Sequence, residues 1–470
     1  MQMFIQLLAL CVAAHAVCNQ PRTRKPFEAM TAIERWTYLY AVELAMDRGY
    51  HAHFAEIHSQ AESFSQAHGG CGFLMWHRRY LLAYENMLRS FGETFECITI
   101  PYWNYFADYA KFQNQQCNSL ESCSEILQFL GGSSGQQDTV QIDGRSVSGR
   151  CNQERPNNNF CESSQAETCK GCLPRGNWAE SEFPSGLGYA SLTNLLHAST
   201  NYSALSTSVE RSFHNSIHNV AGSTMATSVS PADVIFWSHH ATIDMVHHVF
   251  YECHVGRTMN ESEKMTSDLA FGQCDGLDAE SEIIMLWENE NGTGIPAHEH
   301  AVLEPFFRDT GSQYMHFVDS LDMGNHSYGY EVDELIHELT ENGLTCPQGR
   351  PDRTLRRLET TSDTDDSSND QDAEEAETKV ISWYDAAHKE IEDAGHSEEE
   401  TYMILVCLEC RYHEYHLGGV ENFSPEFREE FGVDYSTECW DLLHGDSNQE
   451  CQGHLAEWDH IIEDAYANNQ

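Results

Sequence analysis

Residues 214–244 read HNSIHNVAGSTMATSVSPADVIFWSHHATID, a mostly apolar stretch that contains several histidines. His214 and His218 are four residues apart, which places both imidazoles on one face of a helix, one turn apart. His240 follows in a second segment, in which Ser230-Pro-Ala-Asp marks a helix start. A buried histidine beside aromatic residues needs a partner, and a metal ion is one. The stretch therefore predicts two helices that present three histidines to one metal.

A second group of histidines lies upstream in the chain. We expect His77 to open a helix, His68 to lie in the loop AHGGCG, and His58 to end the preceding helix. His51 and His53 compete with His58 for the third place. A lone histidine is more often a core or surface residue. Two triplets that each mix helix and loop positions nevertheless predict two metal sites.

The donor atoms of these two sites indicate which metal they bind. Neutral imidazoles without a thiolate or carboxylate suit copper and zinc. Helical zinc hydrolases need a glutamate directly after the first histidine of such a pair, and Asn215 occupies that position here. Two three-histidine sites leave coordination positions open. Two copper ions in them could exchange two electrons with O2.

Longer motifs around both triplets carry a resemblance to a known family. GGCGFLMWHRRYLLAYE (69–85) with IPYWNY (100–105) resembles the copper-A region of tyrosinases, and 214–244 resembles their copper-B region. The likeness extends over roughly residues 22–330. It implies a mainly α fold with a four-helix-bundle copper core and long disulfide-stapled loops. It also implies two copper ions, with O2 as co-substrate.

The resemblance assigns the metal ligands residue by residue. One copper would be bound by His58, His68 and His77, and the other by His214, His218 and His240. Within the adjacent pair, His240 rather than His239 takes the family position. Phe54, four residues before His58, matches the family pattern and favours His58 over His51 and His53.

The resemblance also implies roles for residues that do not bind metal. Phe236 takes the place of an aromatic gate over the second copper. Asn215 matches the asparagine that, with a glutamate, orients a water in members that hydroxylate monophenols. Glu210 is the nearby carboxylate on the N-terminal side. Tyr328-Gly-Tyr330 is similar to the motif that closes the catalytic domain, and its arginine partner would be Arg22 or Arg24.

The sequence departs from the family pattern at several positions. Met75 replaces a proline and Asn104 an aspartate, changes that leave every ligand in place. No cysteine lies two residues before His68, so a Cys–His thioether is not available there. Cys71 is expected in a disulfide.

The first residues predict export. Residues 4–14 are an apolar run followed by Ala14-His-Ala16, so residues 1–16 are expected to be a signal peptide. Removing it takes Cys11 from the 17 cysteines, and an even number remains for disulfides. Five Asn-x-Ser/Thr sequons agree with secretion. No later segment is apolar enough to span a membrane.

Charge and composition divide the chain. The net charge is −48, which excludes nucleic acid and anionic membranes as expected partners. We expect a catalytic domain over 17–348, an acidic linker over 349–379 and a small acidic helical domain with its own cysteines over 380–470. Residues 361–470 hold 30 acidic and 4 basic side chains.

Arg353-Thr-Leu-Arg-Arg357 offers an activating protease a dibasic site, and the tail is expected to cover the copper pocket. Its histidines near 388–416 are expected to face solvent.

Together these features predict a secreted copper phenol oxidase. It would hydroxylate tyrosine-like monophenols and oxidise catechols to o-quinones with O2. One alternative is an enzyme that oxidises catechols only. Others are a hemocyanin-like oxygen carrier without turnover, and a secreted structural protein with zinc in the histidine sites.

Overall fold

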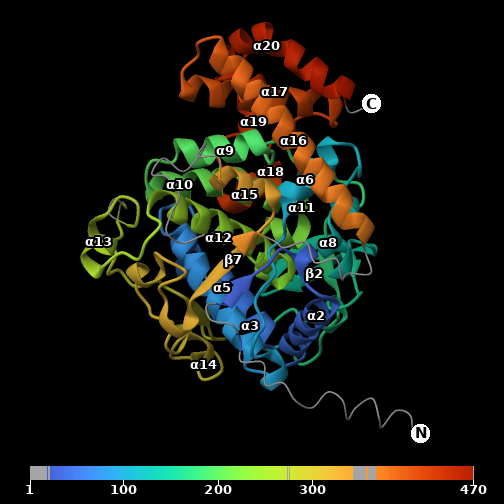
Figure 1. Cartoon of the computed structure of the whole chain (residues 1–470). Helices are drawn as coiled ribbons and strands as arrows, with labels where there is room; N and C mark the ends of the chain where they lie inside the picture. The colour runs from blue at the N-terminus through green and yellow to red at the C-terminus, as the bar shows by residue number, and fades with distance from the viewer. Residues whose placement is uncertain are drawn as a thin grey trace, which may run out of the picture.

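The structure is a computed structural model. It describes Cys18 and residues 22–271, 274, 276–341, 356–357 and 367–468. The expected mainly α fold is confirmed (Figure 1). None of the helices in these ranges combines the length and apolar character that a membrane span requires. The expected signal peptide lies outside the described residues.

The helices that carry the histidines lie in the middle of the molecule (Figure 1). α5 packs against α12 and against α10, and α3 follows α2 and packs on it. Thr31 and Glu34 form a capping box at the start of α2, as the pattern Thr31-Ala-Ile-Glu34 predicts. The bounds are α2 (Ala32–Asp47), α3 (Tyr50–Ser59), α4 (Ala61–Ala67), α5 (Phe73–Arg89), α10 (Tyr202–Val209), a π-helical turn (Glu210–His214), α11 (Asn215–Ala221) and α12 (Ile235–His254).

Three helices that carry histidines have other bounds than the sequence predicts. The pattern over residues 51–62 predicts one helix, but the segment is divided into α3 and α4, because the Gln60 side chain caps a new helix. α5 begins at Phe73, so His77 lies inside it instead of opening it. α12 begins at Ile235, after a short 3-10 turn (Ser230–Ala232). Asp233 forms a buried ion pair with Arg175, 2.7 Å between Oδ1 and Nη2, and its Oδ1 also accepts from the amide of Ile235, the first residue of α12, at 3.2 Å.

The remaining helices surround this core. Those before residue 342 are α6 (Tyr105–Gln113), α7 (Leu120–Cys123), α8 (Glu125–Phe129), α9 (Tyr189–Ala198), α13 (Glu261–Thr266), α14 (Glu304–Phe307) and α15 (Glu334–Glu341). The C-terminal helices are α16 (Ser367–Asp393), α17 (Glu398–His416), α18 (Pro425–Phe431), α19 (Glu438–His444) and α20 (Asn448–Asn468).

The strands are short. Residues 113–188 are rich in Asn, Gln, Gly, Ser and Cys, a composition that predicts a long disulfide-stapled loop region. Three disulfides do staple this segment, and it also contains β2, β3 and β4. The sequence also predicts short strands near 97–103 and 139–142. The second is part of β2, whereas the first is reduced to a single bridge between Pro26 and Tyr102. The bounds are β1 (Arg22–Arg24), β2 (Gln136–Ile142), β3 (Arg145–Asn152), β4 (Leu173–Arg175), β5 (Leu286–Glu288), β6 (Gly294–Pro296), β7 (Tyr328–Val332) and β8 (Arg356–Arg357).

A buried ionic network joins β1, at residues 22–24, to β7, at residues 328–332. β1 pairs with β7 in parallel, with Arg24 opposite Tyr330. Arg24 donates to Asp244, Glu85 and the Tyr330 hydroxyl, so Arg24 and not Arg22 is the partner of the tyrosine motif. Burial alone would raise the pKa of Asp244, but the guanidiniums of Arg78 and Arg24 lower it well below its usual range. Asp244 is thereby kept ionised at the helix that carries His240.

The C-terminal helices pack on the rest of the molecule (Figure 1). α16 lies against α6 and α9, and α17 lies against α9. The cysteines of this tail pair among themselves, Cys407 with Cys451 and Cys410 with Cys439, as their even number predicts. The expectation that the tail histidines face solvent was wrong for His413. Its ring is buried and accepts or donates a hydrogen bond at 2.8 Å to the Tyr109 hydroxyl on α6.

Two described parts of the expected linker form secondary structure. α16 begins at Ser367, inside the segment expected to be a linker. Arg356 and Arg357 pair with Glu331 and Val332 of β7 as the short parallel strand β8. The rest of the dibasic site, from Arg353, lies outside the described residues.

Glu409 on α17 holds the tail against the N-terminus of α9. Its carboxylate accepts from the Ala190 amide at 2.9 Å and from the Ser191 hydroxyl at 3.0 Å. A side chain at Gly188 would collide with this carboxylate, since an added Cβ would lie 2.1 Å from it. Burial raises the pKa of Glu409 from 4.5 to about 7. This junction is therefore sensitive to pH.

We expect the docking of the tail to weaken as the pH rises. The docked carboxyl keeps a proton that the undocked one loses, so docking loses stability between pH 4.5 and about 7 and then levels off. Hydrogen-exchange protection of the α9 amides, corrected for intrinsic rates, should fall over this window. Glu409→Gln should reduce that slope, and Glu399→Gln on the exposed face of α17 should leave it unchanged. An unaltered slope in Glu409→Gln would contradict the assignment.

Candidate metal centre

The upstream histidines form one compact group. His58 near the end of α3, His68 directly after α4 and His77 on α5 bring ligand nitrogens within 4.8 Å of one another. The competing histidines lie outside this group. His51 uses both ring nitrogens in hydrogen bonds, to the Tyr84 hydroxyl and the Ala232 carbonyl. The Nδ1 atom of His53 contacts the Gly49 carbonyl oxygen.

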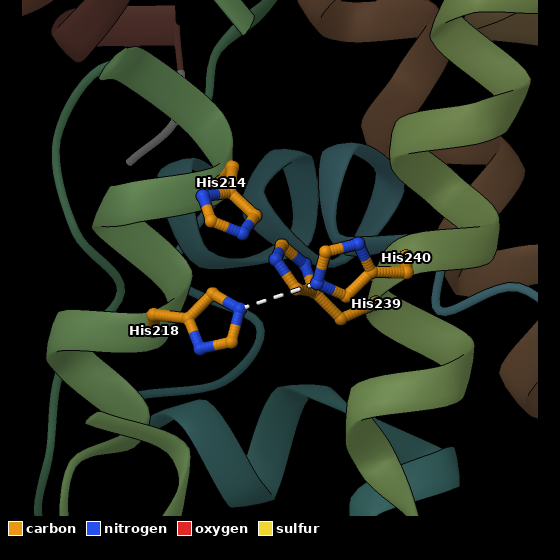
Figure 2. A group of neighbouring side chains, drawn as sticks. All are labelled: His214, His218, His239 and His240. Carbon is orange, nitrogen blue, oxygen red and sulfur yellow. Dashed lines mark hydrogen bonds between the residues drawn. The ribbon is translucent and has the colours of Figure 1, made fainter. Parts of the chain in front are cut away.

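The downstream group contains four histidines instead of the expected three. His214, His218, His239 and His240 also have ligand nitrogens within 4.8 Å of one another. Figure 2 shows His214 and His218 projecting from one helix and His239 and His240 from another, with their rings between the two helices. The Nε2 atoms of His218 and His240 are 3.4 Å apart.

Hydrogen bonds select one tautomer for five of these rings. A carbonyl oxygen only accepts, so a ring nitrogen that meets it must carry the proton, and the other nitrogen keeps its lone pair. The Nε2 atoms of His58, His77 and His214 have no hydrogen-bond partner among the described residues. The Nδ1 partners are the carbonyl oxygens of Ser228 (His58, 2.7 Å), Phe64 (His68, 3.1 Å), Phe73 (His77, 2.9 Å) and Met225 (His218, 2.5 Å), and Oδ1 of Asn215 (His214, 2.8 Å).

These imidazoles are neutral. Burial lowers the pKa of His218 to about 4 and that of His68 to about 3, and it lowers the pKa of the others well below 6.5. Neutral nitrogen donors with free lone pairs are what copper and zinc bind. The orphaned Nε2 atoms therefore fit copper ions in both groups.

The two groups share one space. The rings of His77 and His240 stack with centroids 4.1 Å apart, and the rings of His68 and His214 are 5.9 Å apart. Two ions held by the two groups would therefore be neighbours. Two adjacent metals can act on one small substrate together.

Phenylalanine rings line this space. Phe236 is fully buried, with its ring 4.1 Å from His240 and 5.2 Å from His58. Phe431 comes from α18 of the tail, and its ring lies 5.9 Å from both His68 and His218. No pattern in the sequence marks Phe431 as a neighbour of this centre, because more than 200 residues separate it from His218.

Glu210 begins the π turn that ends at His214, and Asn215 follows it. A π turn adds a residue to a helix and is frequent at functional sites, but no residue type marks it in a sequence. Glu210 Oε1 accepts from the Gly69 amide at 2.7 Å, next to His68, and burial raises its pKa to about 7. Asn215 Oδ1 accepts a hydrogen bond from His214 Nδ1, and Asn215 Nδ2 donates to the Tyr435 hydroxyl of the tail at 2.6 Å.

The departures from the family pattern lie away from the donor atoms. Met75 is buried in the core, and Asn104 donates a hydrogen bond to Asp333. Cys71 forms a disulfide with Cys274, as expected.

Comparisons with known proteins agree with this geometry. The family model described as the common central domain of tyrosinase matches residues 48–252, a range that includes all seven histidines of the two groups. The tyrosinase of Streptomyces antibioticus is 30% identical over 248 residues, which cover 47% of this chain and 80% of that protein. This chain belongs to the tyrosinase family. The tyrosinase of Streptomyces glaucescens is 27% identical over 254 residues, covering 47% of this chain and 79% of that one.

Two further matches are more distant. A putative tyrosinase-like protein of Caenorhabditis elegans is 23% identical over 244 residues, 51% of this chain and 32% of that protein. A polyphenol oxidase structure from Thermothelomyces thermophila aligns at 17% identity and a TM-score of 0.41, covering 70% of this chain and 94% of the other.

Membership of the tyrosinase family sets the general class of this protein. The family is one of binuclear copper proteins that act on phenols. The chain is accordingly a copper phenol oxidase of the type 3 class.

Proposed function

We propose that this chain is a secreted tyrosinase that hydroxylates monophenols and oxidises o-diphenols to o-quinones with O2. The observation that carries the proposal is the arrangement of Nε2 lone pairs in two adjoining histidine groups. His58, His68 and His77 would hold one copper, and His214, His218 and His240 the other. The two ions would supply two-electron exchange with O2. Rapid darkening of a catechol solution by the copper-loaded protein tests the reaction, whereas O2 binding without turnover would indicate an oxygen carrier.

The chain's own residues would position the phenol and remove its proton. A substrate ring would lie against Phe236, whose ring centroid is 4.1 Å from that of His240 and 5.2 Å from that of His58. A phenol has a pKa of about 10, so it rarely loses its proton in neutral water. Glu210, with a pKa of about 7, is suited to accept that proton near neutral pH. Asn215 would hold His214 in the tautomer whose Nε2 is free.

We expect Glu210→Gln to depress tyramine hydroxylation by about tenfold or more, which corresponds to about 1.4 kcal/mol in the barrier. Asn215→Ala should act in the same direction. Catechol oxidation should suffer less, because a catechol is easier to deprotonate and oxidise. The measurement is kcat/KM for both substrates after removal of the tail. Glu62→Gln on the exposed face of α4 is the control.

The result of this experiment distinguishes an enzyme that hydroxylates monophenols from one that oxidises catechols only. An equal loss of kcat/KM on tyramine and on catechol would show that Glu210 does not accept the proton of the monophenol. Absence of monophenol turnover in the wild-type enzyme would leave an oxidase of catechols only.

Secretion is part of the proposal. Cleavage after Ala16 would leave Val17 as the first residue. Support comes from the disulfides at both ends of the chain, such as Cys18–Cys97 and Cys410–Cys439, because such bonds persist in oxidising compartments. N-terminal sequencing of the protein from a culture medium tests this. An intact Met1 on protein retained in cells would contradict it.

We also propose that the tail is a separate unit that masks the centre until a protease cuts the acidic segment. The catalytic unit would extend over 17–348, the linker over 349–379 and the tail unit over 380–470. Contacts of the tail with the histidine groups support the proposal, since Phe431 lies against His68 and His218. Glu430 adds an ion pair with Arg145 at 2.7 Å.

A further inference from the structure

A pocket of about 420 Å³ lies between α6 and the helices of the tail. Its wall takes residues from the C-terminal end of α6 and from α16, α17 and α20, and α16 packs on both α6 and α17 (Figure 1). Pockets of about 300–1,000 Å³ hold small organic molecules in proteins. None of the residues of this wall belongs to either histidine group, so the pocket is distinct from the metal centre.

Much of the wall is apolar and aromatic. Val380, Trp383 and Ala387 of α16 recur at intervals of three and four residues, so they share one face of that helix. Tyr412 of α17 and Ile461 of α20 line the same space. Trp383 is only partly buried, which leaves a part of its ring available for contact with a ligand. These rings and aliphatic groups suit the hydrocarbon body of a small molecule.

The charged groups of the pocket favour a cation. Glu390 and Glu409 both line it. Glu390 has one oxygen 2.8 Å from His460 Nε2, and its second oxygen can accept further hydrogen bonds. Lys379, the basic residue among those of the described wall, already forms an ion pair with Glu375, 2.9 Å between Nζ and Oε1. The wall therefore offers a ligand negative charge rather than positive charge.

The hydrogen-bond acceptors of the pocket indicate the same class of ligand. The side-chain oxygens of Gln113 and Asn114, two residues of the wall, are buried without a hydrogen-bond partner among the described residues. An unpaired buried acceptor is costly, and a ligand with N–H groups can offset that cost. Around the pocket, residues 361–470 hold 30 acidic and 4 basic side chains, and a field of that sign attracts cations.

We propose that this pocket binds a small aromatic amine, with its ring against Trp383 and Tyr412 and its ammonium group toward Glu390 and Glu409. Attraction between a cation and aromatic faces adds to charge-assisted hydrogen bonds with the carboxylates. The wall is complete only while the tail helices lie on α6, so a bound amine stabilises the docked tail by mass action. Under the proposed masking, on which this consequence rests, the amine keeps the metal centre covered.

Isothermal titration calorimetry of the full-length, copper-loaded chain tests the site. The probe is 2-phenylethylamine, which has no phenol hydroxyl and is therefore not a substrate of the proposed reaction. We expect one amine to bind per chain. The alcohol 2-phenylethanol, which has the same ring and chain without the charge, should bind about tenfold more weakly or worse.

Variants of α16 assign the binding to this pocket. Trp383→Ala should weaken binding of the amine by about tenfold, and Glu390→Gln, at a more exposed position, by about threefold. Asp385→Asn is the matched control, because Asp385 is an exposed carboxylate of the same helix outside the wall. Hydrogen-exchange protection at the C-terminal end of α6 should rise when the amine is added to the wild-type chain.

The copper centre is excluded as the binding site by His77→Ala, which should bind the amine as tightly as the wild-type chain. Equal affinities for the amine and the alcohol would overturn the inference. Affinities that Trp383→Ala and Glu390→Gln leave unchanged, or binding that His77→Ala abolishes, would also overturn it. Copper content and catechol oxidation are measured separately, so failure of the proposed function is distinguishable from failure of this inference.

Discussion

His77→Ala should reduce the copper content from two ions per chain to about one and abolish catechol oxidation. The first site has three imidazoles, and His77 is fixed on α5 by its Nδ1 hydrogen bond to the Phe73 carbonyl oxygen. Two neutral donors hold a copper ion poorly, and the reaction needs both metals. The loss of turnover should be about a thousandfold or more, comparable with removing a main catalytic element. Metal analysis of the purified protein and an oxygen-uptake assay measure the two effects.

The remaining ligands extend this prediction. His218→Ala and His240→Ala should also remove nearly all turnover, since both rings lie at the second site. His53→Ala is the matched control, because His53 lies on the same helix as His58 but outside the group. Full copper content and full activity in His77→Ala would exclude the assignment of the first site.

Removal of the tail should raise the activity of the full-length protein by about tenfold or more, because the occupied space must open before a phenol enters. Fully burying a phenylalanine side chain contributes about 1.5–3 kcal/mol. Phe431 is partly buried, so its contact with the centre supplies a part of the free energy that keeps the tail docked. Limited trypsin treatment in the acidic segment, followed by a catechol assay, measures the effect. Unchanged specific activity after the tail is cut away would contradict masking.

Point variants separate masking by the ring from a general effect of proteolysis. Phe431→Ala in the uncut chain should recover a part of the gain, because it removes the ring that lies against His68 and His218. Tyr415→Ala is the control, since Tyr415 is 62% exposed on α17 and should leave the activity as it is. Equal effects of the two variants would indicate loosening of the tail rather than opening of the centre.

Local patterns in the sequence determined much of the fold and the candidate site. The i, i+4 spacing places His214 and His218 on one face whatever surrounds the helix. Thr31 and Glu34 form a capping box from side chains three residues apart. The even number of tail cysteines predicted disulfides, although not their partners. Such features depend on atoms within one or two turns of chain, so they can be read without the fold.

The tertiary structure alone decided which distant groups meet, because burial and long-range pairing are not written in any short stretch. Arg24 rather than Arg22 enters the network of Asp244, since β1 pairs with β7 in a register that only the packed core sets. His51 has the same residue type as His58, but its nitrogens are already hydrogen-bonded in the core. Phe431 reaches the centre because α18 packs there. His239 reaches it because of the face that α12 presents to His214 and His218. The free energy of desolvating these side chains depends on all their neighbours at once.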